Sequence, residues 1–418
     1  MSCRLLFGLI VMCLLGISQV DSAQSQALPV FSKSGPDAVN YGEAENYPVK
    51  QSQGARDQRN LVGNYSHLDQ IRPSRLIAAP HEASELTRGK EELELAYQYQ
   101  GKTETLASYL ERTPVTGLLI MQSNKILFEH YQYARTDKDR LTSQTMAQGL
   151  VGILFGLALH EGKIRSLDDT VATYVPELAG RETGKTPLRN LLQMTSGLSF
   201  HEIYNGHDDI AQLSREMMRD PKDGPVNAVK SFDGRAAAPG AVFNYSSLDS
   251  ELLGLVVSRA TGLPLADLVQ TRLWEPLGAE ADASWITGAS GHELAYCCFN
   301  ATLRDWGRLG GMLSQDGAWN GKQIVPTEWL KATATSENPA QVAGNNGRRL
   351  GYGYQFWLMP GDRRQILLVG IYGQTMLIDP IRHVVLVQTA VMPRAADKGI
   401  RQELFALWQA LVARMDAE

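Results

Sequence analysis

The chain has 418 residues, with a formal net charge of −5 and an isoelectric point near 6.0. Its lysines and arginines are scattered, so the sequence does not indicate nucleic acid or an acidic membrane surface as a partner. A chain of this length can hold two or three domains, although large enzymes of similar length also fold as single units.

Residues 1–23 have the layout of a secretory signal peptide. Arg4 precedes an apolar run from Leu5 to Ile17, and the short residues expected near a cleavage site follow at Asp21, Ser22 and Ala23. The run is too short to anchor the mature protein, and no later segment reaches the roughly 18 apolar residues of a transmembrane helix. We therefore expect a periplasmic or secreted protein without a stable membrane anchor.

Removal of this segment would leave two cysteines, Cys297 and Cys298, which are adjacent in the sequence. They lack the spacing of a metal site. A disulfide between neighbours closes a small strained ring, so we expect two buried or half-buried thiols in a strand.

Residues 24–95 are rich in Gln, Ser, Pro, Asn and Gly and have too few apolar residues for a core of their own. We expect an extended N-terminal arm, which either lies on the main domain or stays mobile. The main domain is expected to span residues 96–418.

The main domain begins with two short apolar runs, 115–121 and 126–131, that predict a β-hairpin. Residues 145–161 are apolar nearly all round and end at Gly162, which predicts a buried helix with a glycine cap. Glycines at positions 149, 152 and 156 leave one face of this helix bare, so another element should pack closely against it.

Further patterns complete the domain. Helices are predicted at 188–194 and 247–261, strands at 365–370, 374–378 and 383–390, and a closing amphipathic helix at 401–415. Strands at both ends with helices between them predict an α+β fold, in which one antiparallel sheet is formed by both chain ends and carries a helical insert.

The segment from Leu141 to Leu178 resembles the first motif of the serine β-lactamase and penicillin-binding-protein family, in which Ser-x-x-Lys opens a buried helix. Further family segments follow in order: Thr186–Gly197, Pro239–Ser247, Asn300–Gly307, Gly351–Trp357 and Gly370–Pro380. The resemblance covers about residues 95–418 and is closest to the branch with esterases and 6-aminohexanoate-oligomer hydrolases. It implies a β-lactamase/transpeptidase-like fold and covalent catalysis, with a hydroxyl nucleophile and two backbone N–H groups that hold the oxyanion.

Two residues depart from the family motif, since Thr145 stands where the serine belongs and Gln148 where the lysine belongs. The extra methyl of threonine fixes its rotamer and crowds the line of attack. Glutamine can hydrogen-bond, but it cannot act as a base or supply positive charge. Losing a general base lowers the rate by ~10²–10⁴-fold, or about 3–5 kcal/mol of barrier.

The resemblance also assigns the second and third motifs. Tyr245 matches the tyrosine that moves the proton, and Ser247 stands where asparagine is common. Without a nearby cation the pKa of a tyrosine is too high for a base near neutrality, so a structural tyrosine is an equally good interpretation.

In the third motif, Tyr372 and Gly373 border the substrate, and the Gln374 N–H is implied as the oxyanion donor that acts beside the Thr145 N–H. This motif lacks the family's Lys or His, which disfavours penicillin-like anions as ligands.

Two His-containing clusters, at 201–202 and 207–209, lack the spacing of a zinc motif and predict a polar loop beside the pocket. No metal or cofactor is indicated. Two functions stay open: a secreted hydrolase of neutral amides or esters acting through acyl-Thr145, and an inactive pseudoenzyme that binds a small ligand in the same pocket.

Overall fold

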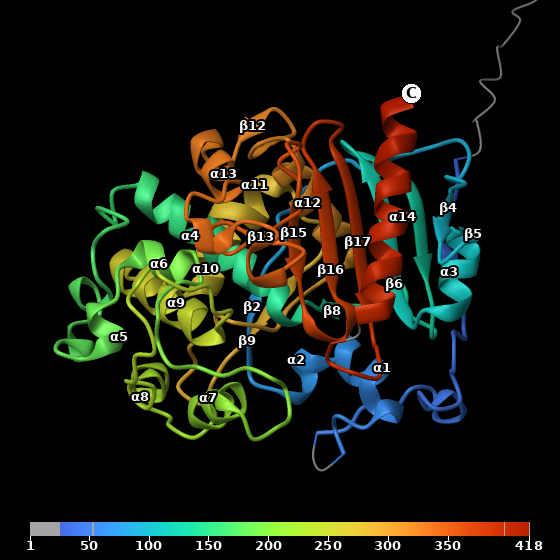
Figure 1. Cartoon of the computed structure of the whole chain (residues 1–418). Helices are drawn as coiled ribbons and strands as arrows, with labels where there is room; N and C mark the ends of the chain where they lie inside the picture. The colour runs from blue at the N-terminus through green and yellow to red at the C-terminus, as the bar shows by residue number, and fades with distance from the viewer. Residues whose placement is uncertain (1–25, 52–53, 397, 418) are drawn as a thin grey trace, which may run out of the picture.

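The computed structural model describes residues 26–51, 54–396 and 398–417. The predicted signal peptide lies outside these residues. Figure 1 shows a helical region, formed by the middle of the chain, beside a sheet that both chain ends build.

The central sheet has nine strands, in the order β1, β7, β6, β17, β16, β15, β14 and β13, with β3 also paired to β7. Their bounds are β1 Val30–Phe31, β3 Thr87–Arg88, β6 Val115–Gln122, β7 Lys125–Tyr131, β13 Gly351–Tyr352, β14 Trp357–Leu358, β15 Ile366–Val369, β16 Thr375–Asp379 and β17 Val384–Ala390. The predicted hairpin is β6 and β7, and β17 pairs antiparallel with β6, which joins the two chain ends. The α+β prediction is confirmed, and among the strands that the structure describes only the short β1 and β3 pair in parallel, both with β7.

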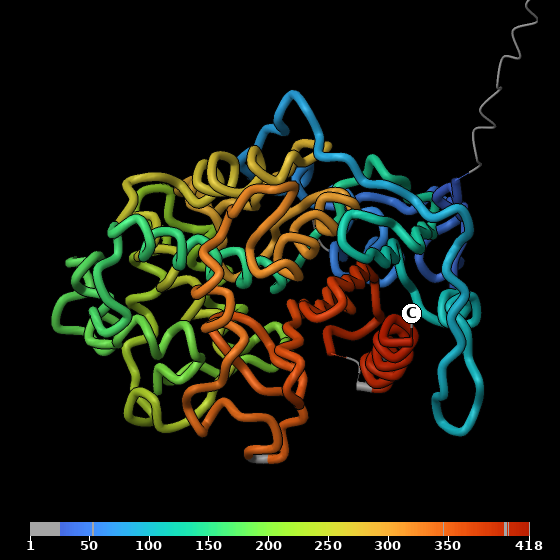
Figure 2. Tube along the Cα trace, turned by 90° about the horizontal axis from the view of Figure 1, so that it is seen from above, coloured from blue at the N-terminus to red at the C-terminus, as the bar shows by residue number. Residues whose placement is uncertain are grey.

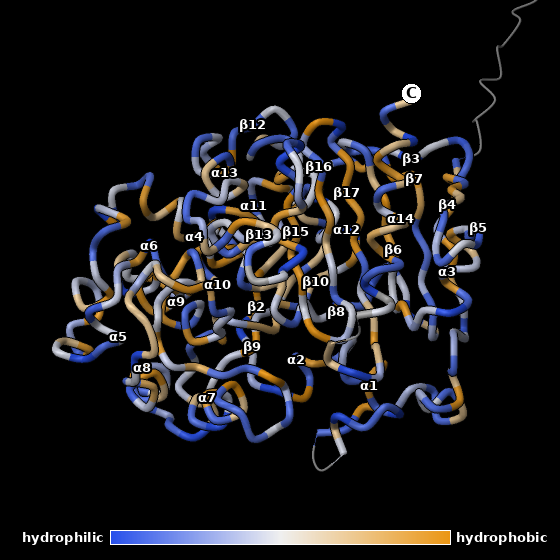
Figure 3. The backbone as a smooth tube through the Cα atoms, in the orientation of Figure 1, coloured by the Kyte–Doolittle hydropathy of each residue, from blue (hydrophilic) through white to orange (hydrophobic). Residues whose placement is uncertain are grey.

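Successive residues of the strands face opposite sides of the sheet, and each side has its own core. Leu118 and Ile120 of β6 pack on the side of the C-terminal helix α14 (Lys398–Ala417), with Trp408. Leu119 and Met121 pack on the other side, with the helical region. Figure 3 shows apolar residues along the strands of this sheet, which therefore lies as a middle layer between two layers of helices.

The helix α4 (Ala147–His160) is buried along almost its whole length, as predicted. A Cβ at Gly156 would lie 2.2 Å from the Trp329 Nε1, so this face admits only glycine. The same indole N–H donates to the Gly152 carbonyl oxygen at 3.1 Å. The bare face of the helix is thus occupied by an aromatic side chain.

The remaining elements surround α4 and the sheet. The helices are α1 Gln58–Ser66, α2 Leu68–Ile71, α3 Leu106–Arg112, α5 Glu182–Lys185, α6 Leu188–Leu192, α7 Asp209–Met217, α8 Gly224–Lys230, α9 Ser247–Thr261, α10 Leu265–Val269, α11 Glu275–Leu277, α12 Leu303–Ser314 and α13 Thr327–Thr333. A second sheet has the order β2, β9, β10, β8, with bounds Ser74–Ile77, Ala283–Ile286, Phe299–Ala301 and Leu141–Thr142. Two hairpins complete the fold, β4 Ala96–Tyr99 with β5 Lys102–Thr105, and β11 Ala318–Trp319 with β12 Lys322–Gln323.

The described part of the N-terminal arm lies on the rest of the chain. Strands β1 and β3 extend the central sheet, and β2 extends the second sheet. Tyr41 and Tyr47 form a small core with Tyr133, and Tyr41 Oη donates to the Val391 carbonyl oxygen at 2.5 Å. In Figures 1 and 2 the blue N-terminal residues and the red helix α14 lie on the same side of the molecule, away from the green helical region.

In the described residues, no single helix has both the length and the apolar character needed to cross a membrane; the bent pair Ser247–Thr261 and Leu265–Leu277 passes that test only when the two are taken together.

Candidate active site

Thr145 lies at the start of the buried helix, in the short 3-10 helix Gln144–Met146 that leads into α4. Its side chain is buried, with 8% of its surface exposed. The Thr145 Oγ1 donates to the carbonyl oxygen of Val369, the last residue of β15, at 3.1 Å. The hydroxyl therefore lies between the helix start and one edge of the sheet.

Gln148 and Tyr245 form a hydrogen-bonded pair beside Thr145. The Tyr245 hydroxyl donates to the Gln148 Oε1 at 2.8 Å, and its ring stacks on Trp357 with 5.5 Å between the ring centroids. Gln148 is 3% exposed, and its Nε2 has no hydrogen-bond partner among the described residues. The amide of Gln148 thus occupies the place of a lysine ammonium without its charge.

Burial raises the pKa of Tyr245 above its ordinary value, and the nearby charge of Glu202 raises it further. Hydrogen bonds with Thr145 and Gln148 act in the opposite direction but do not offset burial. Tyr245 is therefore a protonated phenol near neutral pH, and it cannot accept the proton of Thr145.

The sheet edge beside Thr145 is formed by the residues that follow β15. Ile371 and Tyr372 line the same cavity as Thr145, whereas Gly373 and Gln374 do not. Gln374 is fully buried, and its side-chain Nε2 donates to the Ala390 carbonyl oxygen at 2.7 Å. The structure thus brings Thr145, Ile371 and Tyr372 together, and it places the predicted pair Gly373 and Gln374 outside this cavity.

The backbone N–H groups along this edge differ in their partners. The N–H of Gly370 donates to Gln374 at 2.8 Å, and that of Tyr372 donates to Ala395 at 2.9 Å. Within the part of the chain that the structure describes, no backbone acceptor is found for the N–H of Ile371. Among the described residues, no acceptor is found for the N–H groups of Gly373 and Gln374 either, so this edge offers more than one donor to a ligand oxygen.

A residue that the motif comparison did not single out completes the site. Glu202 accepts hydrogen bonds from the Ser247 hydroxyl at 2.9 Å, from the Ser247 N–H at 2.9 Å and from the Tyr204 hydroxyl at 2.5 Å. Burial raises the pKa of Glu202, and the hydrogen bonds from Tyr204 and Ser247 act against this. The predicted polar loop therefore borders the cavity. The signal that could have identified Glu202 is its place in the polar cluster 201–202, which was predicted to lie beside the pocket.

The cavity at this site has a volume of about 540 Å³, large enough for a small organic ligand. Its walls come from distant parts of the chain: the helix start with Thr145, the loop with Glu202, the helix α7, the strand edge with Ile371, and the arm with Tyr65. The arm therefore forms one wall of the cavity. The sequence alone did not predict whether the arm lies on the main domain or stays mobile.

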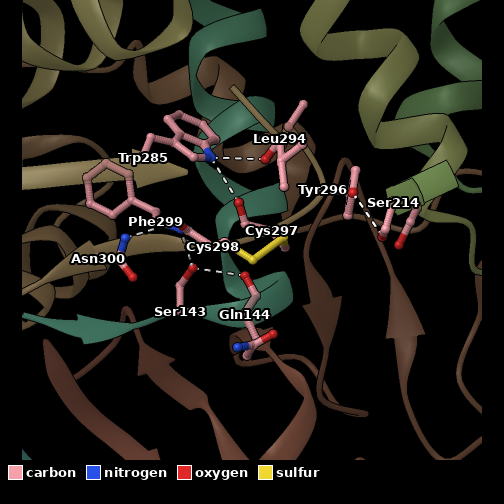
Figure 4. Close-up of a disulfide and its surroundings, with 12 residues drawn as sticks. Ser143, Gln144, Ser214, Trp285, Leu294, Tyr296, Cys297, Cys298, Phe299 and Asn300 are labelled. Atoms are coloured by element: carbon pink, nitrogen blue, oxygen red, sulfur yellow. Dashed lines mark hydrogen bonds between the residues drawn. A yellow bond between two sulfur atoms is a disulfide. The ribbon is translucent and has the colours of Figure 1, made fainter. Parts of the chain in front are cut away.

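Cys297 and Cys298 form a disulfide, so the expectation of two free thiols is wrong. Figure 4 shows this bond between Gln144 and the indole of Trp285. The Cys298 N–H donates to the Gln144 carbonyl oxygen at 3.0 Å, and the Trp285 Nε1 donates to the Cys297 carbonyl oxygen at 2.9 Å. Cys298 has a φ of 73°, and these contacts hold the turn in that conformation. Both cysteines line the cavity.

No group of three or more His, Cys, Asp or Glu side chains in the described residues is arranged to hold a metal ion. His201 is exposed beside Asp209, with 3.4 Å between its Nδ1 and the Asp209 Oδ2. The described lining of the cavity includes hydroxyl, amide, carboxylate, guanidinium and backbone groups.

Fold and site together define a class of protein. The Thr145 hydroxyl at the start of a buried helix lies near a tyrosine and near a sheet edge whose N–H groups are partly without acceptors among the described residues. These groups stand on an α+β domain whose sheet is closed by both chain ends, which is the architecture of the β-lactamase/transpeptidase-like hydrolases.

Comparisons with known proteins identify the family. The β-lactamase family model matches residues 104–398, and the chain belongs to this family. A 6-aminohexanoate-dimer hydrolase from Paenarthrobacter ureafaciens is 25% identical over 299 residues, which cover 69% of this chain and 75% of that protein. The family predicted from the motifs is thereby confirmed.

Solved structures show the same fold. A Bacillus anthracis protein provisionally named a 6-aminohexanoate-dimer hydrolase superposes with a TM-score of 0.77 at 23% identity, covering 88% of this chain and 99% of that one. A D-stereospecific amidohydrolase from Streptomyces gives a TM-score of 0.54 at 17% identity, covering 70% and 94%.

Proposed function

We propose that this β-lactamase-family protein binds a small amide- or ester-containing molecule in the cavity beside Thr145, and that it hydrolyses this molecule slowly or not at all. One observation carries the proposal: the Tyr245 hydroxyl donates to the Gln148 Oε1 at 2.8 Å, where an active member needs a base. Neither partner can remove the proton of Thr145, and a missing general base lowers the rate by ~10²–10⁴-fold.

The groups that bind a carbonyl are better retained than those that activate a nucleophile. The N–H groups of Ile371 and of the motif residue Gln374 both lack a backbone acceptor in the described residues, and Ile371 also lines the cavity, so either can hold a ligand carbonyl together with the N–H of Thr145. A ligand carbonyl can therefore be held at the site even where no acyl group is transferred.

Slow acyl transfer through Thr145 is the second candidate function. It is favoured by the retained hydroxyl of Thr145, which lies near Tyr245. Its hydrogen is committed to the Val369 carbonyl oxygen at 3.1 Å, so attack would first require this bond to break.

Intact-mass spectrometry separates the two candidates. The native protein and the variant Thr145→Val are each incubated with p-nitrophenyl acetate and with a panel of β-lactams, and adducts are located by peptide mapping. Thr145→Val keeps the shape of the side chain and removes the hydroxyl, so it controls for acylation of surface lysines. We expect the same adduct pattern for both proteins. Rapid, stoichiometric acylation of Thr145 would contradict our proposal and establish the second function.

We also propose that the protein is periplasmic or secreted. The support is the layout of residues 1–23 and the disulfide, since oxidising compartments favour disulfides. N-terminal sequencing of protein recovered outside the cytoplasm tests this; a mature chain beginning near residue 24 is expected.

A further inference from the structure

The disulfide of Cys297 and Cys298 lies in the wall of the cavity beside Thr145. Both cysteines line this cavity; Cys297 is 8% exposed and Cys298 is half-buried, so the pair is accessible from the cavity. Residues 24–418 contain no other cysteine. A thiol that enters the cavity therefore meets an electrophilic sulfur at this pair.

The turn that carries the disulfide is hydrogen-bonded to the residues that precede Thr145. The Cys298 N–H donates to the Gln144 carbonyl oxygen at 3.0 Å, and the Phe299 N–H donates to the Ser143 Oγ at 3.0 Å. In return, the Ser143 N–H donates to the Phe299 carbonyl oxygen at 2.8 Å. Figure 4 shows the disulfide beside these residues. A change in the backbone of the turn therefore reaches the helix start directly.

Both residues that meet at this contact have a positive φ, 47° for Gln144 and 73° for Cys298. Side chains other than glycine rarely adopt this conformation, and it persists where the surroundings impose it. The disulfide closes a small ring that includes the peptide bond between the two cysteines, so the S–S bond itself restricts the backbone of Cys298. Reduction removes that restriction and weakens the hold of the Cys298 N–H on Gln144.

We propose that Cys297 and Cys298 form an exchange site for a low-molecular-weight thiol, and that their redox state controls the position of the helix start that carries Thr145. A thiolate RS⁻ attacks the sulfur of Cys298, the more exposed cysteine, and the S–S bond breaks with Cys297 as the leaving thiolate. A second RS⁻ attacks the RS sulfur of the mixed disulfide and releases Cys298. The protons of both RSH molecules end on the cysteines, so the protein disulfide is reduced and RSH is oxidised to RSSR.

The place of the pair favours a small thiol over a thiol carried on a protein. An attacking sulfur has to approach in line with the S–S bond, and the other walls of the cavity come from α1, α7 and the strand edge with Ile371. A volume of about 540 Å³ admits a whole molecule of cysteine or 2-mercaptoethanol, but not a folded protein. The exchange uses no group of the Thr145 motif, so it stands apart from the proposed ligand binding.

The first experiment measures exchange in the folded protein. The native protein is incubated with millimolar cysteine or 2-mercaptoethanol, or with micromolar reduced thioredoxin, then quenched, alkylated with N-ethylmaleimide and mapped by tandem mass spectrometry. The variant Ile210→Trp fills part of the cavity from α7, and Gln212→Trp is the matched control, since position 212 is on the same helix and does not line the cavity. Thermal melting checks that both variants fold.

We expect small thiols to reduce the native disulfide at a rate proportional to their concentration, with a transient adduct on Cys298. Ile210→Trp should slow this reaction by about threefold or more, and Gln212→Trp should leave it unchanged. Reduction of the native disulfide only after denaturation, or equal rates in both variants, would overturn the exchange site. Rapid reduction by thioredoxin that Ile210→Trp does not slow would assign the pair to a protein reductant and overturn the proposed small thiol.

The second experiment measures hydrogen exchange of peptides that contain residues 143–146, before and after reduction with a phosphine. These amides should exchange about tenfold faster in the reduced protein, whereas those of β6 should not change. The double variant Cys297→Ser with Cys298→Ser should match the reduced protein and should not respond to the phosphine. Equal exchange at 143–146 in the oxidised and reduced protein would overturn control of the helix start. Neither experiment uses a ligand of Thr145, so failure here leaves the proposed binding function standing.

Discussion

Restoring the family motif, by the paired substitutions Thr145→Ser and Gln148→Lys, should raise esterase activity by more than the two single substitutions combined on a free-energy scale. A serine without its base stays protonated, and a lysine without the serine has no proton to accept. The structure supports an interaction between positions 145 and 148, because Tyr245 lies beside both Thr145 and Gln148.

The size of the gain follows from the missing base. A positioned base contributes about 10²–10⁴-fold, or about 3–5 kcal/mol of barrier lowering. We therefore expect the double variant to exceed the native kcat/KM by about 10²-fold or more, and each single variant by less than about tenfold.

The same substitution has a cost in stability, because position 148 is 3% exposed. Burial disfavours a charged lysine, so its folded pKa should fall below the unfolded value of about 10.4. The unfolded chain then binds more protons, and stability should rise with pH until the unfolded lysine titrates. A folded pKa near 7 would correspond to a loss of about 4 kcal/mol at pH 7, so the variant is best assayed at about pH 8 to 9.

The assay is kcat/KM for p-nitrophenyl acetate across the native protein, both single variants and the double variant, with folding checked by thermal melting. The variant Thr145→Val with Gln148→Lys is the control, since it has the base without a hydroxyl. A well-folded double variant no faster than this control would refute the reasoning, and would show that the backbone around Ile371 does not support acyl transfer.

Three further predictions concern the fold. Gly156→Ala should lower the free energy of unfolding in urea by about 1–3 kcal/mol, because its Cβ would lie 2.2 Å from the Trp329 Nε1; an unchanged midpoint would contradict the packing of α4. Burial raises the pKa of Glu251 to about 8, so the folded state favours its protonated form and loses stability as the pH rises from about 4.5 to about 8. Glu251→Gln keeps an acceptor for the Ala295 N–H, which donates to Glu251 Oε2 at 2.9 Å, and should stabilise the protein at pH 8.5 more than at pH 5; equal effects at both pH values would exclude this titration. Finally, denatured protein treated with iodoacetamide should be alkylated at Cys297 and Cys298 only after reduction, and labelling without a reductant would show free thiols.

Local patterns in the sequence were enough to predict the elements around the site. The apolar run before Gly162 predicted α4, since a continuous apolar surface has to be buried on all sides. The pairs of apolar runs predicted β6 with β7, and the ordered motifs identified the family. These features depend on residues close in sequence or on motif order, so a single chain can reveal them.

The details of the site depended on contacts between distant residues. Glu202 accepts a hydrogen bond from Ser247, which is 45 positions away in the sequence, and Thr145 donates one to Val369, which is 224 positions away. No local pattern states which residue after β15 faces Thr145, because a shift of a few positions at a strand end changes which N–H points into the cavity. The motif predicts the Gln374 N–H as the oxyanion donor, and the structure adds that Ile371 and Tyr372 of the same turn line the cavity.

The disulfide and the arm were decided by tertiary structure for the same physical reason. An isolated pair of neighbouring cysteines favours free thiols, but Gln144 and Trp285 hold the turn at Cys297 and Cys298 from elsewhere in the chain. The arm is too poor in apolar residues to fold by itself, and it becomes ordered because β7 and Tyr133 provide the partners that it lacks. The sequence by itself determined the family and its altered dyad, while the walls of the cavity exist only once these distant segments pack together.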